Sequence, residues 1–166
     1  MSAIDRLVRN AAGYAAAFRH AGAQARPTLR LTVLTCMDAR IDPADLLDLR
    51  PGEVHVLRNA GAVVTPDVRR SLAISQSLLG TRAVAVIRHT DCGMLGLSET
   101  FADHLARSVG ARPDWRVHGF TDLAGDLQAA LTELRADPFL HADEIRGFVY
   151  DVGTGQLTEL DEAVAA

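Results

Sequence analysis

The sequence contains no lysine, since all 17 basic residues among its 166 are arginines. This absence excludes a Walker-type phosphate loop, a Schiff-base enzyme and a lysine general base, because each needs an amine side chain. Basic residues are not in excess either. The formal net charge is -4 at pH 7, so electrostatics provide no drive toward nucleic acid.

Cysteine and long apolar runs are also scarce. The only cysteines are Cys36 and Cys92, and no stretch approaches the roughly 20 apolar residues that a membrane span needs. The first residues carry charges where a secretion signal needs an apolar run. We therefore expect a cytoplasmic protein in a reducing compartment, with neither a membrane nor a nucleic acid as partner.

Apolar residues make up 48% of the chain, which suffices for a packed core in a chain of typical single-domain length. Residues 3–22 show apolar side chains at helical spacing, and a linker with glycine and proline follows over residues 21–27. We expect residues 1–26 to form an N-terminal helical arm. Residues 27–166 then form a single domain.

The rest of the chain alternates between strand-like and helix-like segments. Apolar β-rich runs are expected as strands over 29–35, 54–58 and 83–87, and helices over 42–49, 65–79, 96–108 and 121–135. Two further strand-like runs around a Gly-Thr-Gly turn, within 147–160, predict a terminal hairpin. The fold class is therefore α/β: a mostly parallel central sheet of about four strands flanked by helices, with an antiparallel edge strand at the C-terminus.

Potential metal ligands follow two of the predicted strands. In an extended segment, Cys36, Asp38 and Arg40 project to the same side. His89 and Cys92 lie three residues apart at a strand-to-helix turn, so one helical turn brings their side chains together. Functional groups gather beyond the carboxyl ends of such strands. Two sulfurs, one imidazole and one carboxylate form a ligand set suited to tetrahedral zinc.

Other interpretations of the two cysteines are less consistent with the sequence. Cysteines in an apolar chain are often small buried hydrophobes, but here each follows a predicted strand and has another ligand type within three residues. A cysteine phosphatase needs an arginine six residues after its nucleophile, and Asp42 occupies that position relative to Cys36. A C-x-x-C redox pair is also absent from the sequence. A metal site accounts best for the pattern, and residues 27–166 are therefore expected to form a single zinc-binding α/β domain.

Four segments resemble the β-class carbonic anhydrases in their order and spacing: 36–40, 56–61, 71–80 and 89–93. The resemblance covers about residues 30–95 and is carried above all by the paired C-x-D-x-R and H-x-x-C motifs. It implies one Zn²⁺ per chain, held by Cys36, His89 and Cys92. It also implies a catalytic Asp38–Arg40 pair and reversible hydration of carbon dioxide to bicarbonate and a proton by zinc-bound hydroxide.

The same resemblance implies partners and a second state of the site. The partner is a second copy of the chain, in a homodimer that the N-terminal helix embraces and that can pair further into a tetramer. When Arg40 releases Asp38, the carboxylate can become the fourth zinc ligand and close the site. The implied substrate-pocket residues are His55, Ala60, Gly61, Thr90 and Gly93. Arg58 and Asn59 are expected to fix a loop, and Asp91 to hydrogen-bond backbone at its turn.

Several positions depart from the family's pattern. No glutamine shortly precedes Cys36, the segment 71–79 carries no tyrosine, and Arg88 stands where a glycine usually precedes the histidine. Such an altered pocket leaves a hydrolase of carbonyl sulfide or carbon disulfide, a small related gas, as an alternative on the same zinc site. A second alternative is a non-catalytic, zinc-stabilised binding or sensor protein with Asp38 as permanent fourth ligand. Arg40 argues against it, because a purely structural site does not need that side chain.

Overall fold

The computed structural model describes residues 1–160, and the predicted domain boundary at residue 166 lies outside them. The elements follow one another as α1 (Ala3–Ala16), β1 (Leu31–Cys36), α2 (Pro43–Leu46), β2 (Val54–Asn59), the short 3-10 helix η1 (Ala60–Ala62), α3 (Pro66–Ser77), β3 (Ala83–His89), α4 (Thr100–Val109), α5 (Leu123–Ala136), β4 (Glu144–Tyr150) and β5 (Leu157–Glu159). The described helices are all too short or too polar to cross a membrane.

The strands form one sheet with the order β2-β1-β3-β4-β5. The first four are parallel and β5 pairs antiparallel with β4, which confirms the predicted mostly parallel α/β sheet with an antiparallel edge strand. β1 lies between β2 and β3, with Cys36 opposite Asn59 and Thr35 opposite Ile87. The carboxyl ends of these three strands therefore meet at one edge of the sheet.

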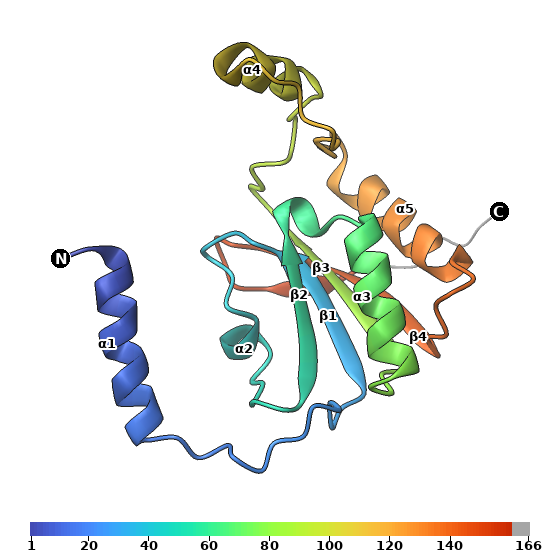
Figure 1. Ribbon diagram of the computed structural model, residues 1–166. Helices are drawn as coiled ribbons and strands as arrows, with labels where there is room; N and C mark the ends of the chain where they lie inside the picture. The colour runs from blue at the N-terminus through green and yellow to red at the C-terminus, as the bar shows by residue number, and fades with distance from the viewer. Residues whose placement is uncertain (161–166) are drawn as a thin grey trace.

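Helices α3 and α5 pack against one face of this sheet (Figure 1). The largest buried cluster joins apolar side chains of α3, α5, β1 and β3: Val68, Leu72, Leu127, Leu131, Leu34, Val84 and Val86. The start of α3 agrees with its sequence signals, since Thr65 caps it by accepting from the Val68 amide and Pro66 occupies its first turn. This packing fixes the sheet that carries the site.

Helix α1 stands apart from the body of the chain (Figure 1), and residues 1–26 are all exposed. It begins where the sequence predicts, with a capping box in which the Ser2 hydroxyl accepts from the Asp5 amide and the Asp5 carboxylate accepts from the Ser2 amide. It ends at Ala16 rather than at residue 22. Because none of its residues is buried, no packing sustains the last predicted turns.

Helix α4 also projects from the body (Figure 1), and it begins at Thr100 rather than at the predicted residue 96. The residues before it have other partners. Leu95 forms an isolated β-bridge with Phe120, and the Gly96 amide donates a hydrogen bond to the Phe120 carbonyl at 2.7 Å. Gly96 also adopts φ +78°. A backbone held in this left-handed conformation cannot belong to the helix.

Candidate metal centre

Cys36, His89 and Cys92 converge at the carboxyl edge of the sheet. Their ligand atoms all lie within 4.8 Å of one another, and the three residues are buried. Cys36 ends β1, His89 ends β3 and Cys92 lies in the turn that follows. Both cysteines are free thiols. The adjacency of β1 and β3 therefore brings together three residues that are far apart in the sequence.

The imidazole of His89 is oriented to bind a cation. Its Nδ1 lies 2.9 Å from the Thr90 carbonyl oxygen, which can only accept, so Nδ1 carries the proton. The Nε2 atom is buried, and no described residue hydrogen-bonds it. A buried nitrogen with a free lone pair needs a partner, and a metal ion between the two sulfurs would supply one.

The surroundings of the two sulfurs also suit a metal. Burial, and to a lesser extent the neighbouring Cys36, raises the pKa of the Cys92 thiol, so a cation is needed to hold Cys92 as a thiolate. The Gly61 amide approaches Cys36 Sγ at 3.3 Å, in a turn where Gly61 adopts φ +81°. A Cβ at this glycine would lie 3.1 Å from the Met94 side chain. Two sulfurs and one imidazole, with room for a fourth ligand, fit zinc.

Beside these ligands, Arg40 joins two carboxylates. Its Nε donates to Asp38 Oδ1 at 3.0 Å and its Nη2 to Asp38 Oδ2 at 2.8 Å. Its Nη1 donates to Asp91 Oδ2 at 2.7 Å, and Nη2 also donates to the Asp91 carbonyl at 2.9 Å. These bonds from Arg40 hold the pKa of Asp38 well below its usual range. Asp38 Oδ2 lies 3.8 Å from His89 Nε2, next to the potential ligands.

Arg58 and Asn59 stabilise the loops around the site. Arg58 on β2 donates through Nε to the Cys36 carbonyl at 3.0 Å and through Nη2 to the Asp38 carbonyl at 2.8 Å. The Asn59 side chain both donates to the Val63 carbonyl and accepts from its amide, each at 2.8 Å. The first pair of bonds positions the segment that carries Asp38, and the second closes the turn that contains Gly61.

The structure divides the residues predicted for the substrate pocket into two groups. A cavity of about 660 Å³ at the site is lined by the Cys36–Arg40 segment together with Ala60, Cys92, Gly93 and Met94. Ala60 and Gly93 thus lie beside the potential ligands, and Gly61 contacts Cys36. Thr90 is not among the lining residues, and its Oγ1 accepts from the Val152 amide. The substrate-binding roles of these residues stay predictions.

His55 lies in a different cavity of the same chain. Its Nδ1 is 2.7 Å from Ser75 Oγ, which also hydrogen-bonds Thr32 and Thr81. This cavity, between β2 and α3, shares no lining residue with the one at Cys36. Within one chain, His55 therefore stays apart from the potential ligands, and its role in a pocket remains a prediction.

The ion pair of Asp91 differs from the expectation that its side chain hydrogen-bonds backbone at the turn. The Asp91 carboxylate instead accepts a hydrogen bond from Arg40 Nη1. The position of Asp91 between His89 and Cys92 places it next to two ligands. Only the adjacency of β1 and β3 shows that Arg40 reaches it.

Comparisons with known proteins agree with the fold. The family model described as carbonic anhydrase matches residues 31–117. The chain is 41% identical over 162 residues to β-carbonic anhydrase 1 of Mycobacterium tuberculosis, covering 96% of this chain and 99% of that one. A solved carbonic anhydrase from Streptococcus mutans superposes with a TM-score of 0.91 at 35% identity, covering 97% of this chain and 99% of that one.

A shorter similarity links the chain to another activity. A carbon disulfide hydrolase of Saccharolobus solfataricus is 47% identical over 66 residues, which span 40% of this chain and 32% of that protein.

The chain belongs to the carbonic anhydrase family, and within it to the β-class, as its sequence motifs predict. The protein is therefore an enzyme of the carbonate dehydratase type, which confirms that prediction.

Proposed function

We propose that the protein catalyses the reversible hydration of carbon dioxide to bicarbonate and a proton at one zinc ion per chain, held by Cys36, His89 and Cys92. The observation that supports this most directly is the buried cluster of two sulfurs and one unpartnered imidazole nitrogen, next to the Asp38–Arg40 pair. A bound zinc ion supplies a Lewis acid that makes water a nucleophile near neutral pH.

The charges of this ligand set assign a task to Asp38. Two thiolates cancel the charge of a divalent cation, whereas three neutral histidines leave it intact, so water here is less acidic than at a three-histidine site. Asp38 can accept a hydrogen bond from the attacking water and orient it. Arg40 keeps Asp38 ionised and aims it through two hydrogen bonds.

Asp91 supports the same arrangement from the other side. By receiving two hydrogen bonds from Arg40, it fixes the guanidinium that holds Asp38. In this proposal, the open state is the one in which Arg40 engages both Asp38 oxygens. The closed state, with Asp38 as fourth ligand, requires Arg40 to release the carboxylate. A non-catalytic zinc protein would not need this three-residue arrangement.

Hydrolysis of carbon disulfide or carbonyl sulfide is the second candidate. A carbon disulfide hydrolase is among the relatives that share part of this sequence, and two methionines, Met37 and Met94, line the cavity. Such an apolar lining suits either gas.

One comparison separates these functions. Purified protein is first analysed for zinc, and is then assayed above pH 8 for carbon dioxide hydration by stopped-flow acidification and for sulfide release from both sulfur gases. Faster carbon dioxide turnover supports our proposal, and faster sulfide release supports the second candidate. Zinc at one per chain with neither activity would leave the sensor alternative, and the absence of zinc would overturn all three.

We further propose that two chains form a dimer in which α1 of each packs on the other, as the family resemblance implies. In one chain the apolar side of α1 is open to solvent: Ile4, Leu7, Val8 and Tyr14 are all exposed, as is Phe18 just after the helix. Residues 1–26 would then be the arm and the rest the zinc-binding domain, and such dimers can pair into tetramers. We also propose the cytoplasm as location, because a reducing compartment keeps both ligand thiols free.

A further inference from the structure

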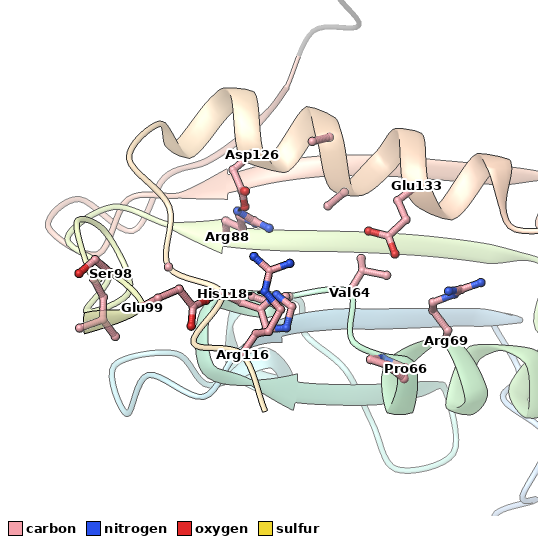
Figure 2. Close-up of a pocket in the computed structure, with 15 residues that line it drawn as sticks. Val64, Pro66, Arg69, Arg88, Ser98, Glu99, Arg116, His118, Asp126 and Glu133 are labelled. Atoms are coloured by element: carbon pink, nitrogen blue, oxygen red, sulfur yellow. Dashed lines mark hydrogen bonds and ion pairs between the residues drawn. The ribbon is translucent and has the colours of Figure 1, made fainter. Parts of the chain in front are cut away.

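A second, polar cavity of about 580 Å³ lies between α3, α5 and the two segments that connect α4 to the body (Figure 2). It shares no lining residue with the cavity at Cys36. Three arginines line it, Arg69, Arg88 and Arg116, together with His118. Neither the metal ligands nor the Asp38–Arg40 pair accounts for this group of basic side chains.

Arg88 is the unusual residue of this cavity. It directly precedes His89 on β3, so its side chain projects to the opposite face of the sheet. The side chain is 3% exposed, and its Nη1 pairs with Asp126 of α5. Its Nε is buried, and no described residue hydrogen-bonds it. A buried guanidinium with a free N–H group lacks an acceptor, which costs free energy.

Arg116 brings a second guanidinium to the same place. Figure 2 shows it in the same part of the cavity as Arg88. Its side chain is 78% exposed, and among the described residues it forms an ion pair with Glu99, whose Oε1 is 3.8 Å from the Arg116 Nε. Both Glu99 oxygens accept from the Val117 amide at 3.2 Å, so Glu99 neutralises Arg116 only weakly. By contrast, Arg69 already has a full partner in Asp137.

The acidic residues of the cavity restrict the kind of ligand. Asp126, Glu99 and Glu133 lie in its walls, and they oppose a bare anion that fills the space. Carboxylates can, however, accept hydrogen bonds from hydroxyl groups. The volume falls within the range of small-molecule sites and exceeds the needs of an inorganic anion. A ligand with an anionic head near Arg88 and Arg116 would suit the arginines. A hydroxylated body near Glu133 would suit the carboxylates.

We propose that this cavity binds a small hydroxylated organic oxyanion, whose phosphate or carboxylate head accepts hydrogen bonds from Arg88 and Arg116. Guanidinium groups match both heads, because their parallel N–H groups pair with two oxygens at once. This site is distinct from the metal centre, and the proposal does not depend on which gas the enzyme converts.

The test is calorimetric titration of the zinc-loaded, full-length protein at constant ionic strength. The probes are inorganic phosphate and acetate for the head group, and glycerol 3-phosphate and glycerate for head plus body. We expect one of the two organic probes to bind saturably with a Kd of about 1 mM. Which of them binds better shows whether the site prefers a phosphate or a carboxylate head. The bare anion with the same head, phosphate or acetate, should bind more weakly.

Variants locate the binding. Arg116→Gln should weaken binding of the better organic probe at least tenfold, while Arg112→Gln should not change it. Arg112 is a suitable control, because it is another exposed arginine and pairs with Asp103 outside the cavity. Absence of saturable binding of every probe up to about 50 mM would overturn the proposal. Equal affinity in wild-type and Arg116→Gln protein, or equal weakening in both variants, would also overturn it, since the anions then bind elsewhere or respond only to net charge.

Discussion

Arg40 and Asp91 are joined by two hydrogen bonds although they lie 51 positions apart in the sequence. Arg40 follows β1 and Asp91 follows β3, so these bonds tie together the two segments that carry the potential metal ligands. The same guanidinium holds both oxygens of Asp38. The position of Asp38 therefore depends in part on the Asp91 carboxylate.

Asp91→Asn should lower kcat for carbon dioxide hydration about tenfold with little change in KM. Mutating a residue that hydrogen-bonds the side chains of a metal site typically lowers metal affinity or activity by about 10- to 100-fold. The substitution weakens the hold on Arg40 and lets Asp38 leave its position. Asp114→Asn, on an exposed loop, is the matched control and should leave kcat unchanged. An Asp91→Asn protein with wild-type kcat would show that Asp38 needs no such support.

Asp38→Ala should retain zinc and lose about 10²-fold or more in turnover, the usual scale for removing a positioned proton acceptor. Elemental analysis and stopped-flow assays of the same preparation measure both quantities. Asp45→Ala, exposed in α2, serves as control and should behave like wild-type protein. Loss of zinc from Asp38→Ala would instead identify Asp38 as a structural ligand.

Removing the metal should destabilise the protein, because the buried His89 nitrogen and both sulfurs then lose their partner. Zinc added back at 100 times its Kd should stabilise the fold by about 2.7 kcal/mol. Thermal unfolding of chelated protein, with and without zinc, measures the shift. Cys92→Ser should show a much smaller response to zinc. An identical response in this variant would place the ion elsewhere.

The Arg69–Asp137 pair should make stability depend on pH. Asp137 is 2% exposed, and hydrogen bonds from Arg69 and from the Phe139 amide lower its pKa. Since the folded-state pKa is below the unfolded value of about 4, the pair stabilises the fold above pH 4 and the gain is lost as pH falls through the folded-state pKa.

Asp137→Asn should accordingly lower the urea midpoint by about 0.5 M at pH 7, and the difference from wild-type protein should shrink toward pH 3. Arg69 is 41% exposed, which limits the size of the effect. Asp67→Asn is the matched control, because its pair with Arg70 is exposed on both sides and should contribute little. A difference that stays constant with pH would show that charge is not its cause.

The arm offers a test of the proposed dimer. Placing charges on the apolar side of α1, in Leu7→Asp/Val8→Asp, should shift the protein toward monomer in light scattering coupled to size exclusion. Arg9→Asp changes charge on the same helix at a residue away from that apolar side, and should leave the dimer intact. A dimer that survives the double substitution would show that α1 is not the contact.

Much of this protein could be predicted locally. Strand and helix signals such as the wholly apolar run before His89 and the Thr65-Pro66 helix start gave the α/β class, because each reflects short-range geometry. The potential ligands Cys36, His89 and Cys92 were also predictable, since residue types with metal affinity followed predicted strands. The predicted helix ends were wrong where they depend on tertiary contacts. Helix α1 ends early because no packing supports its last predicted turns. Helix α4 starts late because the Gly96 amide hydrogen-bonds the Phe120 carbonyl.

Sequence alone thus determined the chemistry available: which residues can bind a metal, and the absence of any lysine. The tertiary structure decided how these groups combine, because the strand order puts β1 beside both β2 and β3. That order brings Arg40 to Asp91 and Arg58 to the Cys36 and Asp38 carbonyls. Spatial adjacency of this kind arises from long-range packing, which no short motif encodes.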